Sequence, residues 1–192
     1  MYPFKEYALV ASISLFTLGS SYSLAQGLPD EGPLADGKIS EEDVGMLIYN
    51  AQQQLIRLSE AATEEYQSSI LDASPNMPGA WMLMNDGKTV KRINIAEQAE
   101  GVPASVQLKM YRAAIKSIAQ RGQINAAAIL YTGRVNEHSD SEVLVIEHEH
   151  RLGVSSNKVI GYNVHNGGIS WAEPVSQEKP FEWFYQRGEG QS

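Results

Sequence analysis

The sequence predicts an α+β domain in which an antiparallel sheet of five or six strands carries two helices on one face. Two long segments with apolar residues at steps of three and four predict the helices, and shorter runs between turn residues predict the strands. Because the strand runs follow one another in groups with no helix between them, they should pair as antiparallel hairpins. The order along the chain is α-β-β-α-β-β-β, with one more short strand at the end.

The first helix should begin after Ser40 and end before Pro75. A serine at the position before a helix can accept a hydrogen bond from the first turn, and the acidic residues 41–43 suit the positive end of the helix dipole. One face of this helix is apolar and should pack on the core: Val44, Leu47, Ala51, Leu55, Leu58, Ala62 and Tyr66.

The first two strands should form a hairpin, Ala80–Asn85 with Lys88–Ile95. Asp86-Gly87 lies between them and is typical of a type I′ turn, which needs residues that tolerate positive φ. Further strands are expected near the C-terminus, at Asn125–Arg134, Glu142–Arg151, Lys158–His165 and, as a short run, after Gly168.

The second helix should begin near Pro103 and end at Gly122, since proline suits the first helical turn and glycine the position after the last. Its apolar stripe is Leu108, Tyr111, Ile115 and Ile118. The opposite side carries a basic stripe, Lys109, Arg112 and Lys116. These cations are expected to face water, although they could also meet an acidic partner or the Glu147/Glu149 region of the same chain.

The N-terminal residues Met1–Ala25 have the pattern of a secretory signal peptide. Lys5 precedes an apolar run, Ala8–Leu18, that is too short to span a bilayer, and Ser23 and Ala25 are the small residues that signal peptidase requires. We therefore expect a signal peptide at 1–25, a flexible linker at 26–39, one α+β domain at 40–186 and a tail at 187–192. Cleavage predicts a periplasmic or secreted protein, whereas an uncleaved anchor or a buried helix is the alternative.

Composition excludes several kinds of site. The net charge of −8 argues against binding to nucleic acid or to anionic lipid. The absence of cysteine excludes disulfides, thiolate metal sites and a cysteine nucleophile. No glycine-rich phosphate loop or GxSxG elbow occurs in the sequence, so we expect no cofactor and assign no catalytic residue.

The segment Glu147-His148-Glu149-His150 is the candidate metal site. On a strand its two histidines share one face and its two glutamates share the other. Two imidazoles can bind one metal ion if a third ligand is near, but a hairpin turn centred near Val154 would place His148 opposite Ile160 and leave His165 too far away. The preferred interpretation is that the strand leaves the core at Glu147 and that its polar end faces water.

A dense aromatic cluster near the C-terminus should seal one edge of the core, and its exposed members would mark an interaction surface: Phe181, Trp183, Phe184 and Tyr185. The sequence therefore favours an exported, non-enzymatic protein-binding or inhibitor (immunity-like) module, acting on a protein partner or through self-association. The alternatives are a metal-dependent enzyme that uses His148 and His150, and a small-molecule sensor. The candidate interaction residues are Lys109, Arg112, Lys116, Glu147, Glu149 and Trp183.

Four segments carry a resemblance to known domains: GAWMLMNDGK, AQRGQINAAAILYTGRV, SEVLVIEHEHRLG and GYNV. They resemble an uncharacterised family of bacterial α+β domains with a dG hairpin, an aaAiaY strand and an LEHrdG strand. The matching positions are Gly79, Asp86, Gly87, Tyr131, Glu147, His148, Gly153 and Tyr162. The resemblance implies the α+β fold and no mechanism. The same order of elements occurs in roadblock-like and profilin-like folds, an analogy that concerns the fold alone.

Overall fold

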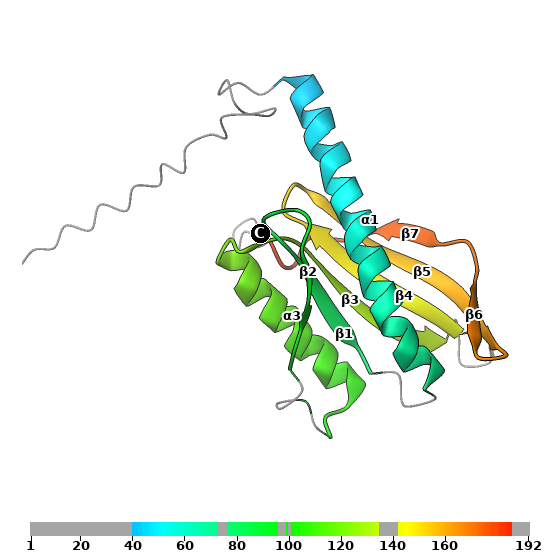
Figure 1. The fold of residues 1–192 in the computed structure, drawn as a ribbon. Coiled ribbons are helices and arrows are strands. Elements are labelled where there is room, and N and C mark those ends of the chain that lie inside the picture. The colour runs from blue at the N-terminus through cyan, green and yellow to red at the C-terminus, as the bar shows by residue number, and fades with distance from the viewer. Residues whose placement is uncertain (1–39, 73–76, 96–98, 100, 135–141, 186–192) are drawn as a thin grey trace, which may run out of the picture.

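The computed structural model describes residues 40–72, 77–95, 99, 101–134 and 142–185. The predicted signal peptide, linker and tail lie outside these residues. Within them, two helices and seven strands form one sheet-based unit (Figure 1). In chain order the elements are α1 (Glu41–Leu71), β1 (Gly79–Met84), β2 (Val90–Ile93), α3 (Ala104–Gln120), β3 (Ile124–Arg134), β4 (Glu142–His150), β5 (Val154–His165), β6 (Gly168–Trp171) and β7 (Val175–Glu178).

The sheet is antiparallel throughout, with its strands in the order β2-β1-β3-β4-β5-β6. β7 pairs with residues 156–159 of β5, and β6 pairs with residues 162–165 of the same strand. The predicted α+β class, antiparallel pairing and order of elements are confirmed. β7 was not predicted, because its four side chains are all exposed and so show no alternation of apolar and polar residues.

The helices cover opposite faces of the sheet. α1 packs on the face that carries Trp81 and Ile146, whereas α3 packs on the face that carries Ala80 and Ile129. Since consecutive residues of a strand point to opposite faces, Ala80 and Trp81 assign the two helices to different sides. The sheet therefore lies between α1 and α3, and the prediction that both helices share one face is corrected.

α1 begins with the predicted cap. The Ser40 hydroxyl accepts a hydrogen bond from the Asp43 amide at 3.1 Å, and the Asp43 carboxylate accepts one from the Ser40 amide at 2.8 Å. The helix is buried against the sheet from Ala51 to Ile70. The predicted core position Val44 is instead 43% exposed, because the first turns of α1 project past the end of the sheet (Figure 1).

The β1–β2 hairpin is confirmed, but its turn is not of type I′. Gly87 has a φ of +64°, whereas Asp86 is not among the residues with positive φ, as a type I′ turn would require. The Asp86 carboxylate instead accepts hydrogen bonds from the amides of Lys88 and Thr89 and from the Thr89 hydroxyl. These bonds, chiefly that of the Thr89 hydroxyl, lower the pKa of Asp86 to about 2.

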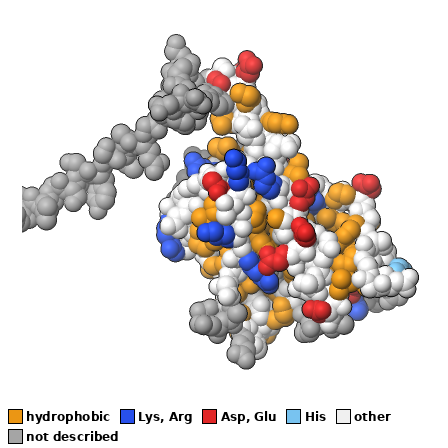
Figure 2. Space-filling model, in the orientation of Figure 1, with side chains coloured by type: hydrophobic (Ala, Val, Ile, Leu, Met, Phe, Trp, Pro, Cys, Tyr) orange, Lys and Arg blue, Asp and Glu red, His pale blue; other side chains and the backbone are white. Residues whose placement is uncertain are grey.

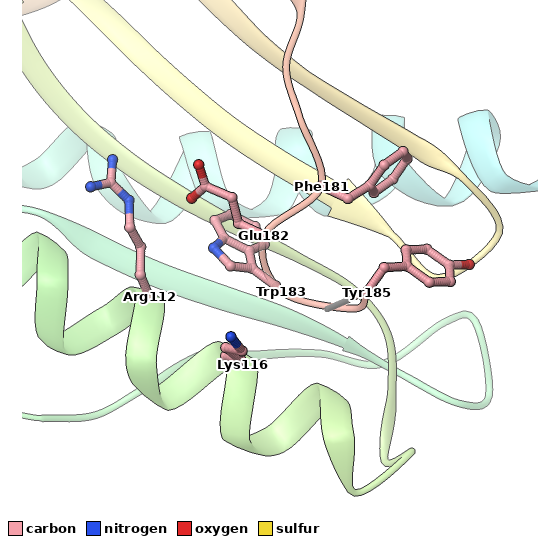
Figure 3. Close-up of a pocket in the computed structure, with 6 residues that line it drawn as sticks. All are labelled: Arg112, Lys116, Phe181, Glu182, Trp183 and Tyr185. Carbon is pink, nitrogen blue, oxygen red and sulfur yellow. The ribbon is translucent and has the colours of Figure 1, made fainter. Parts of the chain in front are cut away.

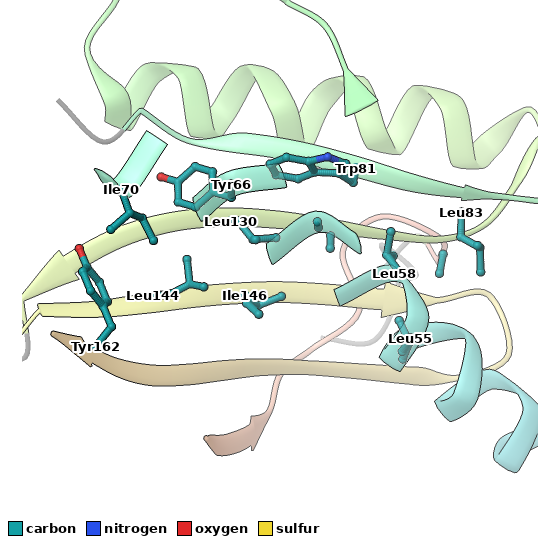
Figure 4. Packing of buried hydrophobic residues seen from close by; sticks show 13 residues of the cluster. Leu55, Leu58, Tyr66, Ile70, Trp81, Leu83, Leu130, Leu144, Ile146 and Tyr162 are labelled. Carbon is teal, nitrogen blue, oxygen red and sulfur yellow. The ribbon is translucent and has the colours of Figure 1, made fainter. Parts of the chain in front are cut away.

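Two apolar cores result, one on each face of the sheet. Beneath α1, Tyr66 and Trp81 (Figure 4) meet edge to face with 6.1 Å between ring centroids. The Trp81 indole also donates a hydrogen bond to Glu65 at 2.7 Å. Beneath α3, the core is closed by Trp183, which comes from the C-terminal residues 179–185, hereafter the strap. No helix of the described segments is long and apolar enough to cross a membrane.

Candidate functional site

The last four residues of β4 form an ionisable segment in the middle of the sheet. Glu147, His148, Glu149 and His150 are only 5%, 5%, 0% and 1% exposed. The prediction that this end of the strand faces water is therefore wrong. β4 lies between β3 and β5, and α1 covers one of its faces while α3 and the strap cover the other. Each of the four side chains needs partners inside the protein.

Glu147 is held by α3 and β3. Arg112 donates to its carboxylate through Nη2 at 2.5 Å and through Nε at 3.2 Å, and the Tyr131 hydroxyl donates at 2.9 Å. Burial, together with the charge of Glu147, raises the pKa of Tyr131 to about 12. The hydrogen bond to Glu147 raises the pKa of Arg112 above its usual value. Arg112, one cation of the basic stripe, thus contacts the Glu147/Glu149 region of its own chain. The sequence left this contact open as one of two alternatives to facing water, the other being an acidic partner.

Glu149 fastens the strap to the sheet. Its carboxylate accepts hydrogen bonds from Lys179 Nζ at 2.5 Å and from the backbone amides of Glu182 and Trp183 at 2.9 Å each. The Lys179 ammonium also lies 4.6 Å from the centroid of the Trp183 ring. A fully buried carboxylate therefore fixes both the backbone and the aromatic anchor of the strap.

The two histidines lie on the other face, under α1. The Leu152 amide donates to His150 Nδ1 at 3.0 Å, so the proton of this imidazole is on Nε2, which donates to Gln54 Oε1 at 3.1 Å. His148 Nε2 lies 2.7 Å from the Ser156 hydroxyl, and its buried Nδ1 has no hydrogen-bond partner in the described part of the chain. Burial lowers the pKa of both histidines to about 4. Both are therefore neutral near pH 7.

A metal site at His148 and His150 gains no third ligand. In the described segments no group of three or more histidine, aspartate or glutamate side chains is arranged to hold a metal ion. The β4–β5 turn comes earlier than predicted, so His148 pairs with Ser156 rather than with Ile160. His165 then lies nine residues further along β5, roughly 30 Å away at about 3.3 Å per residue. The metal site remains a prediction.

A groove between α3 and the strap brings several of the predicted interaction residues together. Its volume is about 350 Å³, and it lies on the face of the sheet that α3 covers (Figure 3). Glu147, bound to Arg112, and Glu149, bound to the strap, lie beneath the groove. Lys109 is not among the residues that line it. This α3–strap groove is lined by Arg112, Lys116, Phe181, Glu182, Trp183 and Tyr185.

A second hollow, of about 300 Å³, continues from this groove past Tyr185 toward the end of α3. It adds the cations Arg121 and Arg151 and the ring of Phe184. Sequence reasoning did not find these two arginines, because neither belongs to the periodic stripe of α3 and only the fold places β4 and the strap beside that helix. The aromatic cluster did carry a signal, since its expected role at the edge of the core is confirmed for Trp183, which is 1% exposed.

The comparisons with known proteins were made against family models, curated proteins and solved structures, and none of the three gives a match to this chain. The likeness to roadblock-like and profilin-like folds and to the bacterial domain family therefore remains an expectation from the sequence. The function has to be argued from the geometry of the chain itself.

Proposed function

We propose that this protein is an exported, non-enzymatic protein-binding module that holds an acidic segment of a partner protein in the α3–strap groove. The observation that supports this most directly is the gathering of cations and aromatic rings around an open groove in a chain of net charge −8. A captured segment is withheld from other contacts, so binding would act as inhibition wherever that segment is functional. Export rests on the signal pattern at 1–25.

Charge selects the partner. Four cations line the groove and its continuation, whereas Glu182 is the acidic residue of their linings and Glu147 is already bound by Arg112. The bidentate contact with Glu147 uses Nε and Nη2 of Arg112, so that Nη1, which has no hydrogen bond to another described residue, can donate to a second carboxylate. Complementary charge also accelerates association with an acidic segment. The cations are Arg112, Lys116, Arg121 and Arg151.

The aromatic side chains of the strap provide a preorganised contact surface. Phe181 and Tyr185 meet edge to face with 5.3 Å between centroids, and Tyr185 is 47% exposed. The Tyr185 hydroxyl donates to the carbonyl oxygen of Arg151, which holds the end of the strap against β4. Rigid aromatic rings lose little conformational entropy on binding, so they are favoured anchors in interfaces.

Charge reversal at Lys116 is expected to weaken binding of an acidic partner. Lys116 is exposed and lines the groove, so Lys116→Glu replaces an attraction by a repulsion without disturbing a buried pair. We expect a short labelled peptide of alternating glutamate and phenylalanine to bind about tenfold more weakly to this variant, and binding to the wild type to weaken as salt is added. Fluorescence anisotropy measures both effects.

The matched control is Lys88→Glu, which makes the same charge change at an exposed position on the β1–β2 turn. It should leave binding unchanged. The proposal fails if a lysine–phenylalanine peptide binds as tightly as the acidic one, or if the two variants behave alike. Light scattering after size exclusion adds a further test, because a dimer that Lys116→Glu dissociates would identify the partner as a second copy.

A further inference from the structure

The face of the sheet that α1 covers carries a third hollow, of about 330 Å³, between α1 and the strands β4 and β5. Its floor is apolar, formed by Ile146, Ile160 and Pro174. Ile146 is 1% exposed and belongs to the core under α1, so the floor is backed by the packed interior. α1 supplies one wall through Ser59, Glu60, Thr63, Glu64 and Gln67, and Lys158 of β5 belongs to the opposite wall.

Ser59 gives this α1–β5 hollow an unsatisfied polar group. The residue lines the hollow and is 6% exposed, and its buried hydroxyl has no hydrogen-bond partner among the residues that the structure describes. A buried hydroxyl without a partner is unfavourable, so a ligand whose polar group reaches this oxygen would gain a hydrogen bond.

The two walls carry opposite charges that form no ion pair with each other among the described residues. Glu60 and Glu64 lie one turn apart on α1, and Lys158 projects from β5, yet none of the three takes part in an ion pair among the described residues. A ligand with an ammonium group, a carboxylate and an apolar body would complement the three parts of the hollow together.

We propose that the α1–β5 hollow is a binding site for a free apolar α-amino acid, such as leucine or phenylalanine. The carboxylate of the ligand pairs with Lys158, its ammonium group with Glu60 and Glu64, and its side chain lies on Ile146 and Ile160. The volume is at the small end of the range for ligand pockets, about 300–1,000 Å³, which suits a molecule of this size. The site is independent of the α3–strap groove, because the sheet separates them.

Titration of the full chain with L-leucine and L-phenylalanine, followed by amide NMR spectra, tests the site. Saturable shifts are expected at residues 59–67 and 158–160. Analogues separate the charge contributions: 3-methylbutylamine lacks the carboxylate, 4-methylpentanoate lacks the amine, and N-acetyl-leucinamide lacks both charges. Each should bind at least about tenfold more weakly than leucine, since each loses a charge-assisted contact.

Variants locate the site. Lys158→Met and the double variant Glu60→Gln/Glu64→Gln should each weaken leucine binding about tenfold, whereas Lys91→Met, at an exposed position on β2, should leave it unchanged. The dispersion of the same NMR spectra reports whether each variant is folded. Absence of shifts with millimolar leucine, equal binding of the uncharged analogue, or shifts confined to another surface would each overturn the proposal.

Discussion

Replacing Glu149 by alanine is expected to destabilise the protein by about 3–5 kcal/mol, because it leaves a buried cation, one buried amide and one part-buried amide without their acceptor. The side chain of Lys179 is only 9% exposed, and the amides of Glu182 and Trp183 have no other recorded acceptor. Since a domain of this kind has a free energy of unfolding of about 5–15 kcal/mol, the variant would lose a large fraction of its stability. Urea unfolding followed by circular dichroism measures the change.

Two controls separate the buried contact from the loss of a glutamate as such. Glu178→Ala removes an exposed glutamate from β7 and should change the free energy of unfolding by less than about 0.5 kcal/mol. The double variant Glu149→Leu/Lys179→Met removes the charge of both partners, and it should be more stable than Glu149→Ala because no unpaired charge remains buried. A loss below about 1 kcal/mol for Glu149→Ala would show that the strap is not held by this carboxylate.

The elements that could be predicted are those whose signal is local. The core positions of α1 from Ala51 onward repeat at helical spacing and are buried, and the capping residues Ser40 and Asp43 act within one turn. The turn predicted near Val154 also exists: Gly153, in the loop between β4 and β5, has a φ of +86°. The predicted register of that hairpin was nevertheless shifted, because the loop has only three residues and β5 begins at Val154.

Burial of the acidic and histidine segment could not be predicted, because its partners are distant in the sequence. Arg112 lies 35 residues before Glu147, and the strap amides lie more than 30 residues after Glu149. A run of four ionisable residues is typical of an exposed strand end, and only the packing of α1, α3 and the strap on both faces reverses that expectation. The same packing explains why the two helices do not share a face.

Acid is expected to destabilise the fold through His148 and His150 before the carboxylates titrate. In the unfolded chain each histidine has a pKa near 6.5, whereas burial lowers it to about 4 in the folded protein. Below about pH 6.5 the unfolded state therefore binds protons that the folded state does not, so stability falls as the pH falls toward 4 and these groups add nothing further below that value. Between about pH 7 and pH 5 the expected loss is about 2 kcal/mol for each histidine.

Variants assign this slope to the two buried imidazoles. In the double variant His148→Gln/His150→Gln, neither position titrates, so the free energy of unfolding should change little between about pH 7 and pH 5 even if the variant is less stable overall. His165→Gln is the matched control, since His165 is exposed and should leave the slope of the wild type intact. Urea unfolding at a series of pH values gives the slopes. A flat profile for the wild type would mean that burial does not keep these two rings neutral, and it would contradict the prediction.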